Sequence, residues 1–119
     1  MIFEEKNIQN SGENGCPKWL DLIEIGKKTY EGRLDKNFWK ELNINDCFYL
    51  TDGIKRVLVR VTDKKYYKDF ASAYTELGQS LVPANFTTSS VVKLYNEYFT
   101  DSDIKKYGVV AVGVEPVKN

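Results

Sequence analysis

The sequence predicts a mainly β fold with packed helices (α+β), in which a small, twisted, barrel-like sheet carries helices across its openings. The expected elements follow the order helix, strand, strand, strand, helix, helix, strand, which differs from the regular alternation of a doubly wound fold. The closing stretch GVVAVGVEPV is almost continuously apolar, so both faces of that strand are expected to be covered. A chain of 119 residues is long enough for a single domain over 1–119 with its own core.

The first third of the chain is expected to supply a strand, a helix and a second strand. Pro17 suits the first helical position because its ring fixes a helical φ, and Gly26 provides the left-handed residue that ends the helix. Residues 1–15 form a polar N-terminal segment. The elements expected here are a short strand at 1–5, a loop at 9–15, a helix at 17–25, a strand at 29–34 and a turn or short helix at 37–42.

A β-hairpin is the clearest feature of the middle of the chain. The pair Asp52-Gly53 is a strong tight-turn signal between the runs DCFYLT and IKRVLVRVT. In the second run a valine at every other position predicts that one face of the strand enters the core. The later elements are expected to be a helix capped by Asp69 and ended by Gly78, a helix opened by Ser89 or Ser90, a helical turn at 100–108 and a strand at 108–117.

Composition excludes several classes of site. The chain has no histidine, and its two cysteines, Cys16 and Cys47, do not form a CxxC pair. Zinc sites and histidine-based catalysis are therefore excluded, and we expect no metal and no cofactor. Both cysteines are expected to be free thiols that pack as small apolar residues.

The sequence also indicates where the protein resides. No apolar run approaches the length needed to span a bilayer, and the acidic, polar start MIFEEKNIQNSGENG lacks the basic start and apolar centre of a secretory signal. We therefore expect a cytoplasmic protein without a membrane partner, monomeric by default.

Basic residues concentrate in one strip, although the formal net charge is zero. Residues 55–68 carry six basic side chains against the single Asp63. A strip of this kind steers anions, and its mixture with Tyr66 and Tyr67 is typical of proteins that bind single strands. The alternative is that a tyrosine docks this segment on the core while the lysines are solvated. The side chains predicted to contact an RNA backbone are Arg56, Arg60, Lys64, Lys65 and Lys68.

A second charged cluster follows the predicted helix stop, in the stretch IEIGKKTYEGRL. In a strand, Thr29, Glu31 and Arg33 share one face, with neighbours about 6.6–6.8 Å apart along the chain. Lys28 lies at the junction and can swing towards that face. Such a cluster suits a planar polar ligand that bears a phosphate, because Arg and Lys bind phosphate oxygens and a carboxylate accepts from an exocyclic amine. The alternative is a solvated strand whose ion pairs contribute little.

The cluster matches the pattern G-x-K-x-x-E-x-R at Gly26, Lys28, Glu31 and Arg33. This pattern resembles the signature of the ASCH (activating signal cointegrator homology) domain. The resemblance extends over about residues 18–117. It is carried by WLDLIEIGKKTYEGRL, by FWKELNINDCFYL with Asn45 where glycine is usual, by YYKDFASAYTELG and by YNEYFTDSDIKKYGVVAVGVEPV.

The resemblance implies a pseudo-barrel of about five to six strands, similar to the PUA (pseudouridine synthase and archaeosine transglycosylase) fold. It also implies a cleft between barrel and helix, and a role in RNA binding. We therefore expect a module that binds RNA, a nucleotide or a nucleoside. Its predicted ligand-binding residues are Lys28, Glu31, Arg33, Gly26 and Tyr30.

An enzyme is the main alternative. Some relatives of this fold hydrolyse 4-acetylcytidine with a lysine and a nucleophilic threonine in a G-x-K-x-x-T-x-R version of the motif. Here Glu31 takes the threonine position, and Thr29 lies two residues too early, a displacement of almost 7 Å along a strand. If the protein is a hydrolase of a modified nucleoside or of RNA, its candidate catalytic residues are Lys28, Glu31 and Thr29. A third possibility is an interaction protein with a vestigial pocket.

Overall fold

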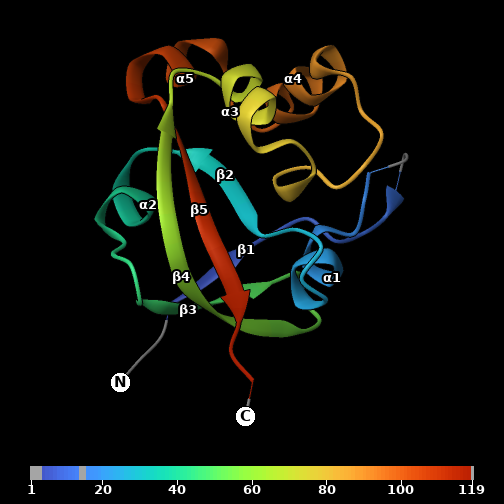
Figure 1. The fold of residues 1–119 in the computed structure, drawn as a ribbon, viewed down its shortest axis with the longest axis vertical. Helices are drawn as coiled ribbons and strands as arrows, with labels where there is room; N and C mark the ends of the chain where they lie inside the picture. The colour runs from blue at the N-terminus through green and yellow to red at the C-terminus, as the bar shows by residue number, and fades with distance from the viewer. Residues whose placement is uncertain (1–3, 14–15, 119) are drawn as a thin grey trace.

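A five-stranded mixed sheet forms the centre of the protein, in a computed structural model that describes residues 4–13 and 16–118. The strand order is β1-β3-β4-β5-β2, in which β1 runs parallel to β3 and the other neighbours are antiparallel. The strands are β1 (Glu5–Asn7), β2 (Tyr30–Leu34), β3 (Cys47–Thr51), β4 (Arg56–Tyr67) and β5 (Val109–Pro116). The predicted fold class is confirmed. The long strand β4 curves strongly, but within the described residues the edge strands β1 and β2 do not pair, so the sheet is not a closed barrel (Figure 1).

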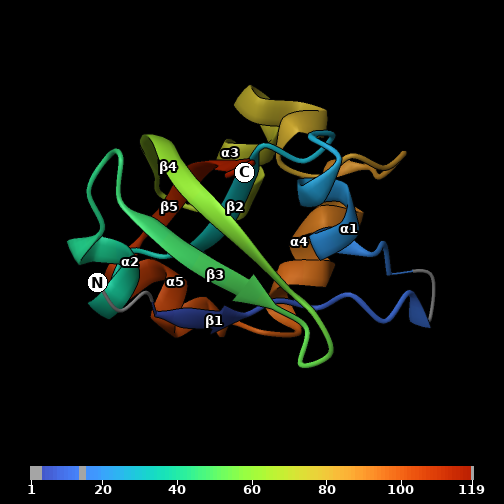
Figure 2. The same ribbon diagram turned by 90° about the horizontal axis from the view of Figure 1, so that it is seen from below.

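The helices lie at one end and on the flanks of this sheet. Figure 1 shows α3, α4 and α5 gathered at one end of β4 and β5, with α1 below α4 on the far side of β2. Figure 2 shows the same arrangement from below, with β1 running beside β3. The helices are α1 (Trp19–Glu24), α2 (Asn37–Glu41), α3 (Phe70–Leu77), α4 (Thr88–Asn96) and α5 (Asp101–Tyr107), and a 3₁₀ turn, η2, spans Gly78–Ser80.

The end of α1 fixes the start of the charged motif. Gly26 has φ +80°, as its predicted role as a helix stop requires. Its N–H donates to the carbonyl of Ile23 at 3.1 Å, and the N–H groups of Lys27 and Lys28 donate to Leu22 at 2.9 and 3.1 Å. The helix itself begins two residues later than predicted, because Pro17 precedes the N-cap residue and α1 starts at Trp19. The backbone of Lys28 is thus tied to the last turn of α1.

The predicted hairpin is present, but its second strand is longer than expected. β4 continues to Tyr67, and the register against β5 shifts between Val61 and Asp63, which marks a β-bulge at Thr62. A Cβ atom at the facing Gly113 would lie 2.5 Å from the Thr62 hydroxyl, so only glycine fits opposite the bulge. The strip residues from Arg56 to Lys65 therefore all lie on one strand, and Lys55 and Lys68 flank it.

Other boundaries differ from the prediction by a few residues. The first strand is Glu5–Asn7 where the sequence predicted 1–5, and residues 1–3 of that prediction lie outside the described residues. Asp69 caps α3 as expected, since its carboxylate accepts from the N–H of Ser72 at 2.8 Å. Helix α4 is capped by Thr87, before the predicted Ser89 or Ser90, because the Thr87 hydroxyl already accepts from the N–H of Ser90.

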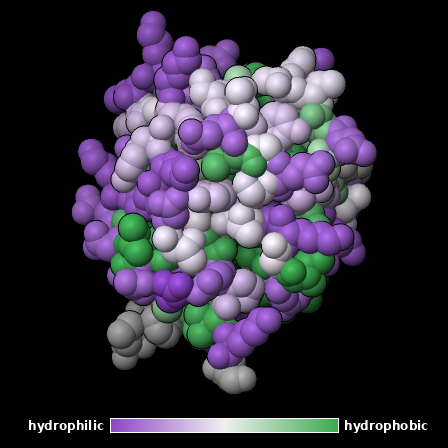
Figure 3. All heavy atoms as spheres, viewed as in Figure 1, coloured by the Kyte–Doolittle hydropathy of each residue, from purple (hydrophilic) through white to green (hydrophobic). Residues whose placement is uncertain are grey.

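The core lies between the sheet and its helices. Every residue from Val109 to Val114 on β5 is buried, as the apolar run predicted. Cys16 and Cys47 are both free thiols, and Cys16 packs against the core. On the face shown in Figure 3, hydrophilic side chains separate small hydrophobic patches. No helix of the described residues is long and apolar enough to cross a lipid bilayer.

Candidate functional site

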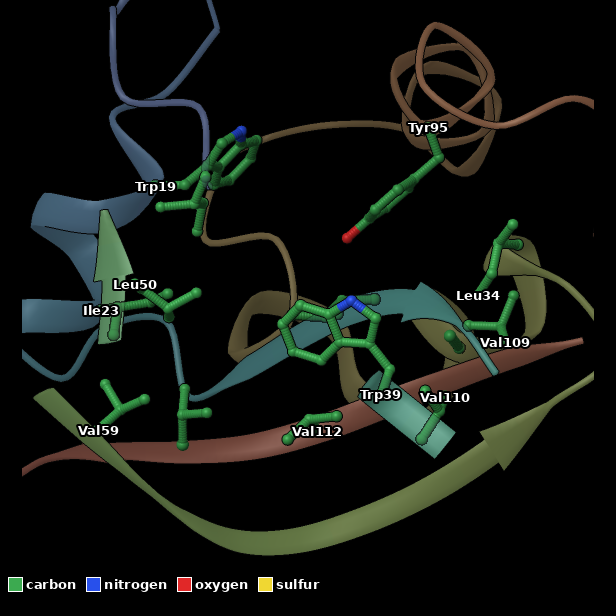
Figure 4. Close-up of a cluster of buried hydrophobic side chains, with 14 of the residues drawn as sticks. Trp19, Ile23, Leu34, Trp39, Leu50, Val59, Tyr95, Val109, Val110 and Val112 are labelled. Carbon is green, nitrogen blue, oxygen red and sulfur yellow. The ribbon is translucent and has the colours of Figure 1, made fainter. Parts of the chain in front are cut away.

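A cleft of about 530 Å³ opens over the middle of β2, between α1 and the end of α4. Its base carries Lys28, Glu31 and Gly32, and Arg33 lies beside them. The rest of the lining comes from the N-terminal strand segment, α1, the β3–β4 hairpin and the α4 region, namely Asn7, Ile8, Gln9, Trp19, Thr51, Asp52, Leu94, Tyr95, Tyr98 and Phe99. Figure 4 shows Trp19 and Tyr95 facing a common space above the strands, with the tyrosine hydroxyl turned into it.

Lys28 is the most deeply buried charged residue of this group, with a relative exposure of 2%. Its Nζ donates to the carbonyl of Tyr30 at 2.6 Å and to that of Leu81, and it lies 3.5 Å from Oε1 of Glu31. These three oxygens match the three N–H groups of an ammonium ion. Burial lowers the pKa of Lys28 from its usual value, and the Glu31 carboxylate opposes this effect. The two carbonyl acceptors and the adjacent carboxylate favour the ammonium form of Lys28 against the effect of burial.

Glu31 is the second buried charge, and it lies between two cations. Its Oε2 accepts from Nη2 of Arg33 at 2.9 Å, while Oε1 faces Lys28. Burial raises the pKa of Glu31, but the charges of Arg33 and Lys28 and their hydrogen bonds lower it by more, so the pKa lies below its usual value. Glu31 is thus an ionised carboxylate at neutral pH.

Arg33 connects the buried pair to the open part of the cleft. Its Nη2 donates to Glu31 and to the backbone carbonyl of Asn7 at 2.7 Å. The guanidinium lies 4.6 Å from the centre of the Trp39 ring, within cation–π range. In the part of the chain that the structure describes, Nε and Nη1 donate to no protein acceptor. Three of the five guanidinium N–H groups therefore remain available to a ligand.

Tyr95 supplies a further polar group to the cleft. Its ring stacks on Phe70, with centroids 4.0 Å apart and planes 7° apart. A Cβ atom at Gly32 would lie only 3.1 Å from the hydroxyl, so the glycine leaves room for it above the strand. Burial raises the pKa of Tyr95, and the nearby Glu31 carboxylate raises it further, so the phenol stays neutral. Among residues 4–13 and 16–118 the hydroxyl has no hydrogen-bond partner.

The structure brings together three of the five predicted ligand-binding residues. Lys28, Glu31 and Arg33 line one cleft. Gly26 is exposed at the end of α1 and does not line it. The side chain of Tyr30 points to the other face of β2, where its hydroxyl donates to Asp63 at 2.7 Å.

The remaining candidate residues also lie away from the cleft. Thr29 precedes β2 and is not part of the lining, although its N–H donates to the carbonyl of Ser80. None of the cations of the basic strip lines the cleft. Arg56 is paired with Glu5 at 3.0 Å, Arg60 is paired with Glu115, and Lys64 donates to two backbone carbonyl groups. The strip and the cleft are therefore separate features.

Sequence reasoning missed the aromatic walls. Tyr95 and Tyr98 follow the helical spacing of core residues, and that spacing alone does not distinguish a core tyrosine from one whose hydroxyl faces a cavity. The residue type of Trp19 was a weak indication of a binding role, since a nucleobase could stack on an indole ring. The polar rim residues Asn7 and Gln9 had no signal, because they belong to a segment that resembles an ordinary polar terminus.

Comparison with known proteins supports the fold and the motif together. A family model of the ASCH domain matches residues 16–118, which is most of the chain. The chain belongs to the ASCH domain family. The family that the motif resembles is thereby confirmed, and Gly26, Lys28, Glu31 and Arg33 all lie inside the matched region. Among curated proteins, none matches this ASCH domain significantly.

Three solved structures resemble this ASCH domain over nearly its whole length. The crystal structure of hypothetical protein PH0355 has a TM-score of 0.84 and 26% identity, with 98% of this chain and 100% of that chain covered. The solution structure of protein PF0455 from Pyrococcus furiosus has a TM-score of 0.77 and 25% identity, with 99% of this chain and 100% of that chain covered. The crystal structure of protein EF3133 from Enterococcus faecalis V583 has a TM-score of 0.67 and 14% identity, with 98% of this chain and 82% of that chain covered. This likeness supports the fold alone.

Proposed function

We propose that this ASCH domain binds a nucleotide unit, free or within RNA, in the cleft over β2. The observation that carries the proposal is the buried Lys28–Glu31 pair, joined by the half-buried Arg33, at the base of an open cleft. Burying the two charges of Lys28 and Glu31 is costly, and apolar residues of similar volume often serve the fold as well or better. Charges that are retained at the base of a cleft despite this cost favour a role in binding a polar ligand.

The shape and chemistry of the cleft agree with a nucleotide. A volume of about 530 Å³ falls in the range of about 300–1,000 Å³ that small-molecule sites occupy. The rings of Trp19 and Tyr98 offer surfaces for an unstacked base, as single-stranded RNA sites do. Glu31 can accept a hydrogen bond from a base, Arg33 can donate, and the Tyr95 hydroxyl can do either.

A thermal-shift screen tests this function directly. Nucleosides, mononucleotides and short single-stranded RNAs are added separately, and calorimetry measures the affinity for each hit. Because a ligand that binds only the folded state raises the melting temperature, the shift should grow with ligand concentration. If neither a shift nor a heat of binding is seen with any of these compounds, the proposal is wrong.

Tyr95→Phe is predicted to weaken binding without weakening the fold. The hydroxyl has no partner in the described residues, so we expect unfolding free energy to change by less than about 0.5 kcal/mol. Loss of one hydrogen bond to the ligand should lower affinity by about 0.5–1.5 kcal/mol, roughly 2- to 13-fold. Calorimetry and urea unfolding measure the two effects.

Tyr74→Phe is the matched control for that variant. The Tyr74 hydroxyl donates to the carbonyl of Phe86 at 2.8 Å and lies outside the cleft. This variant should lose about 0.5–1.5 kcal/mol of stability and keep its affinity. If both variants bind as tightly as the parent protein, Tyr95 makes no contact with the ligand.

The hydrolase alternative makes a different prediction. Lys28 is engaged by three oxygens, Glu31 is held between two cations, and Thr29 lies outside the cleft lining. We therefore expect the purified protein not to deacetylate 4-acetylcytidine, with product formation followed by chromatography. Turnover near the usual enzyme median of about 10 per second would contradict this. If turnover occurs and survives Thr29→Ala, that threonine is not the nucleophile.

We also propose that the basic strip adds non-specific attraction for RNA phosphates. Lys65 and Lys68 form no ion pair in the described part of the chain, so no carboxylate there neutralises their charges. Such contacts release counterions and make binding depend on salt. A cytoplasmic location and a monomeric state remain predictions from the sequence.

A further inference from the structure

A second, smaller cavity of about 220 Å³ adjoins the cleft. Arg33 and Phe99 line both cavities, so the two spaces meet at one arginine side chain. The other polar residues of the second cavity are Lys6, Lys36 and Asn37, and Phe38 and Trp39 supply aromatic surface. A ligand in the cleft can therefore extend past Arg33 into a neighbouring space.

The two cavities differ sharply in charge. The charged residues of the cleft are Lys28, Arg33, Glu31 and Asp52, two cations and two anions. The second cavity is lined by Lys6, Arg33 and Lys36, with no carboxylate among the lining residues described. The neutral cleft suits a base, and the cationic cavity suits an anion.

The cations of the second cavity are available for a ligand. The Lys36 ammonium lies 4.8 Å from the ring centre of Tyr107 and forms no ion pair in the described residues. Lys6 lies over the Phe38 ring at 4.4 Å, and its partner at 3.1 Å is the exposed Glu4, a kind of pair that contributes little. Arg33 still has its Nε and Nη1 hydrogens free among the described groups.

We propose that the second cavity is a phosphate subsite for the ligand whose base occupies the cleft. Arg33 presents the guanidinium fork that matches a phosphate, and the two lysines add charge around it. The inference rests on the proposed nucleotide-binding function and narrows it. The ligand is a phosphorylated nucleoside or a stretch of RNA, and a free nucleoside lacks the group that the second cavity binds.

The test compares ligands that differ only in phosphate. A nucleoside, its 5′- and 3′-monophosphates, a dinucleotide and inorganic phosphate are titrated into the parent protein. They are also titrated into a Lys6→Ala, Lys36→Ala double variant. The Lys105→Ala, Lys118→Ala protein is the control, since it loses the same charge at two exposed lysines that line neither cavity.

We expect the parent protein to prefer a nucleotide over the nucleoside by about tenfold or more, as charge-assisted hydrogen bonds allow. The Lys6/Lys36 variant should lose about tenfold in nucleotide affinity and bind the nucleoside as before, while the Lys105/Lys118 control keeps the preference. The better of the two monophosphates identifies the side of the sugar that faces Arg33. Tighter binding of the dinucleotide than of either monophosphate assigns the subsite to RNA.

Two outcomes would overturn the subsite and leave the cleft as a nucleoside site. One is equal affinity for nucleoside and nucleotides in the parent protein. The other is an unchanged preference in the Lys6/Lys36 variant. If inorganic phosphate alone binds as tightly as a nucleotide, the cavity is an independent anion site and the inference is wrong. If no nucleoside, nucleotide or dinucleotide binds, the proposed function fails and the subsite fails with it.

Discussion

Glu31→Gln lowers the free energy of unfolding by about 3–5 kcal/mol, the cost expected when one member of a buried ion pair is removed. The reason is Lys28, which stays buried at 2% exposure and loses the only carboxylate that pairs with its ammonium among the described residues. Urea unfolding at neutral pH measures the loss. An unchanged m-value would show that the substitution does not alter the surface area exposed on unfolding.

The effect of this substitution should depend on pH. The pKa of Glu31 lies below its ordinary value of 4.5 in the folded protein, so between the two values the unfolded chain binds more protons. The stability that Glu31 contributes is therefore present above the unfolded pKa and is lost as pH falls through the folded pKa. The difference between parent and variant should be full at neutral pH and shrink below about pH 4.5.

Glu115→Gln provides the matched control. Glu115 is also paired with an arginine, Arg60, but its side chain is 53% exposed. Removing this charge should change stability by at most about 1 kcal/mol. A loss for Glu31→Gln as small as that of the control would show that Lys28 does not depend on the carboxylate.

Arg33→Ala has the largest expected effect on binding. Arg33 lines both cavities and has three N–H groups open to a ligand in the described structure. Its removal should cost about 1–3 kcal/mol of binding free energy, roughly 5- to 160-fold, and should blur any preference among bases. Calorimetric titration with a nucleotide, after the variant's folding is verified, measures the change.

Arg60→Ala tests whether this effect is specific to the cleft. Arg60 is a paired arginine of the strip and lines neither cavity. It should leave mononucleotide affinity unchanged. Equal losses for the two arginine variants would mean that the protein recognises charge in general, and the cleft would lose its special role.

The sequence predicted the charged part of the site because that part depends on local geometry. Gly26 ends α1, the next residues enter β2, and strand alternation puts Glu31 and Arg33 on one face. Local geometry therefore predicted that Lys28, Glu31 and Arg33 lie together, while the cleft itself was implied by the resemblance to the ASCH domain. The hairpin, the Asp69 cap and the buried last strand were predicted for the same reason, since their signals lie within a few residues.

The rest could not be predicted because it depends on distant parts of the chain. Lys28 is buried because Leu81, which is 53 residues away in the sequence, supplies one of its acceptors. The extension of β4 to Tyr67 requires Gly113 to leave room for the bulge at Thr62. Tyr95 faces the cleft only because Phe70 supports its ring from α3. No periodicity within one segment carries this information.

A titration followed by amide chemical shifts tests the central claim most directly. A mononucleotide is added to the labelled protein, and the two-dimensional spectrum is recorded at each step. If the cleft binds the ligand, the largest shifts should fall at Trp19, Gly32, Arg33 and Tyr95, with the Trp19 indole signal among them. Shifts confined to residues 55–68, or a spectrum that does not change, would contradict the assignment of function to this cleft.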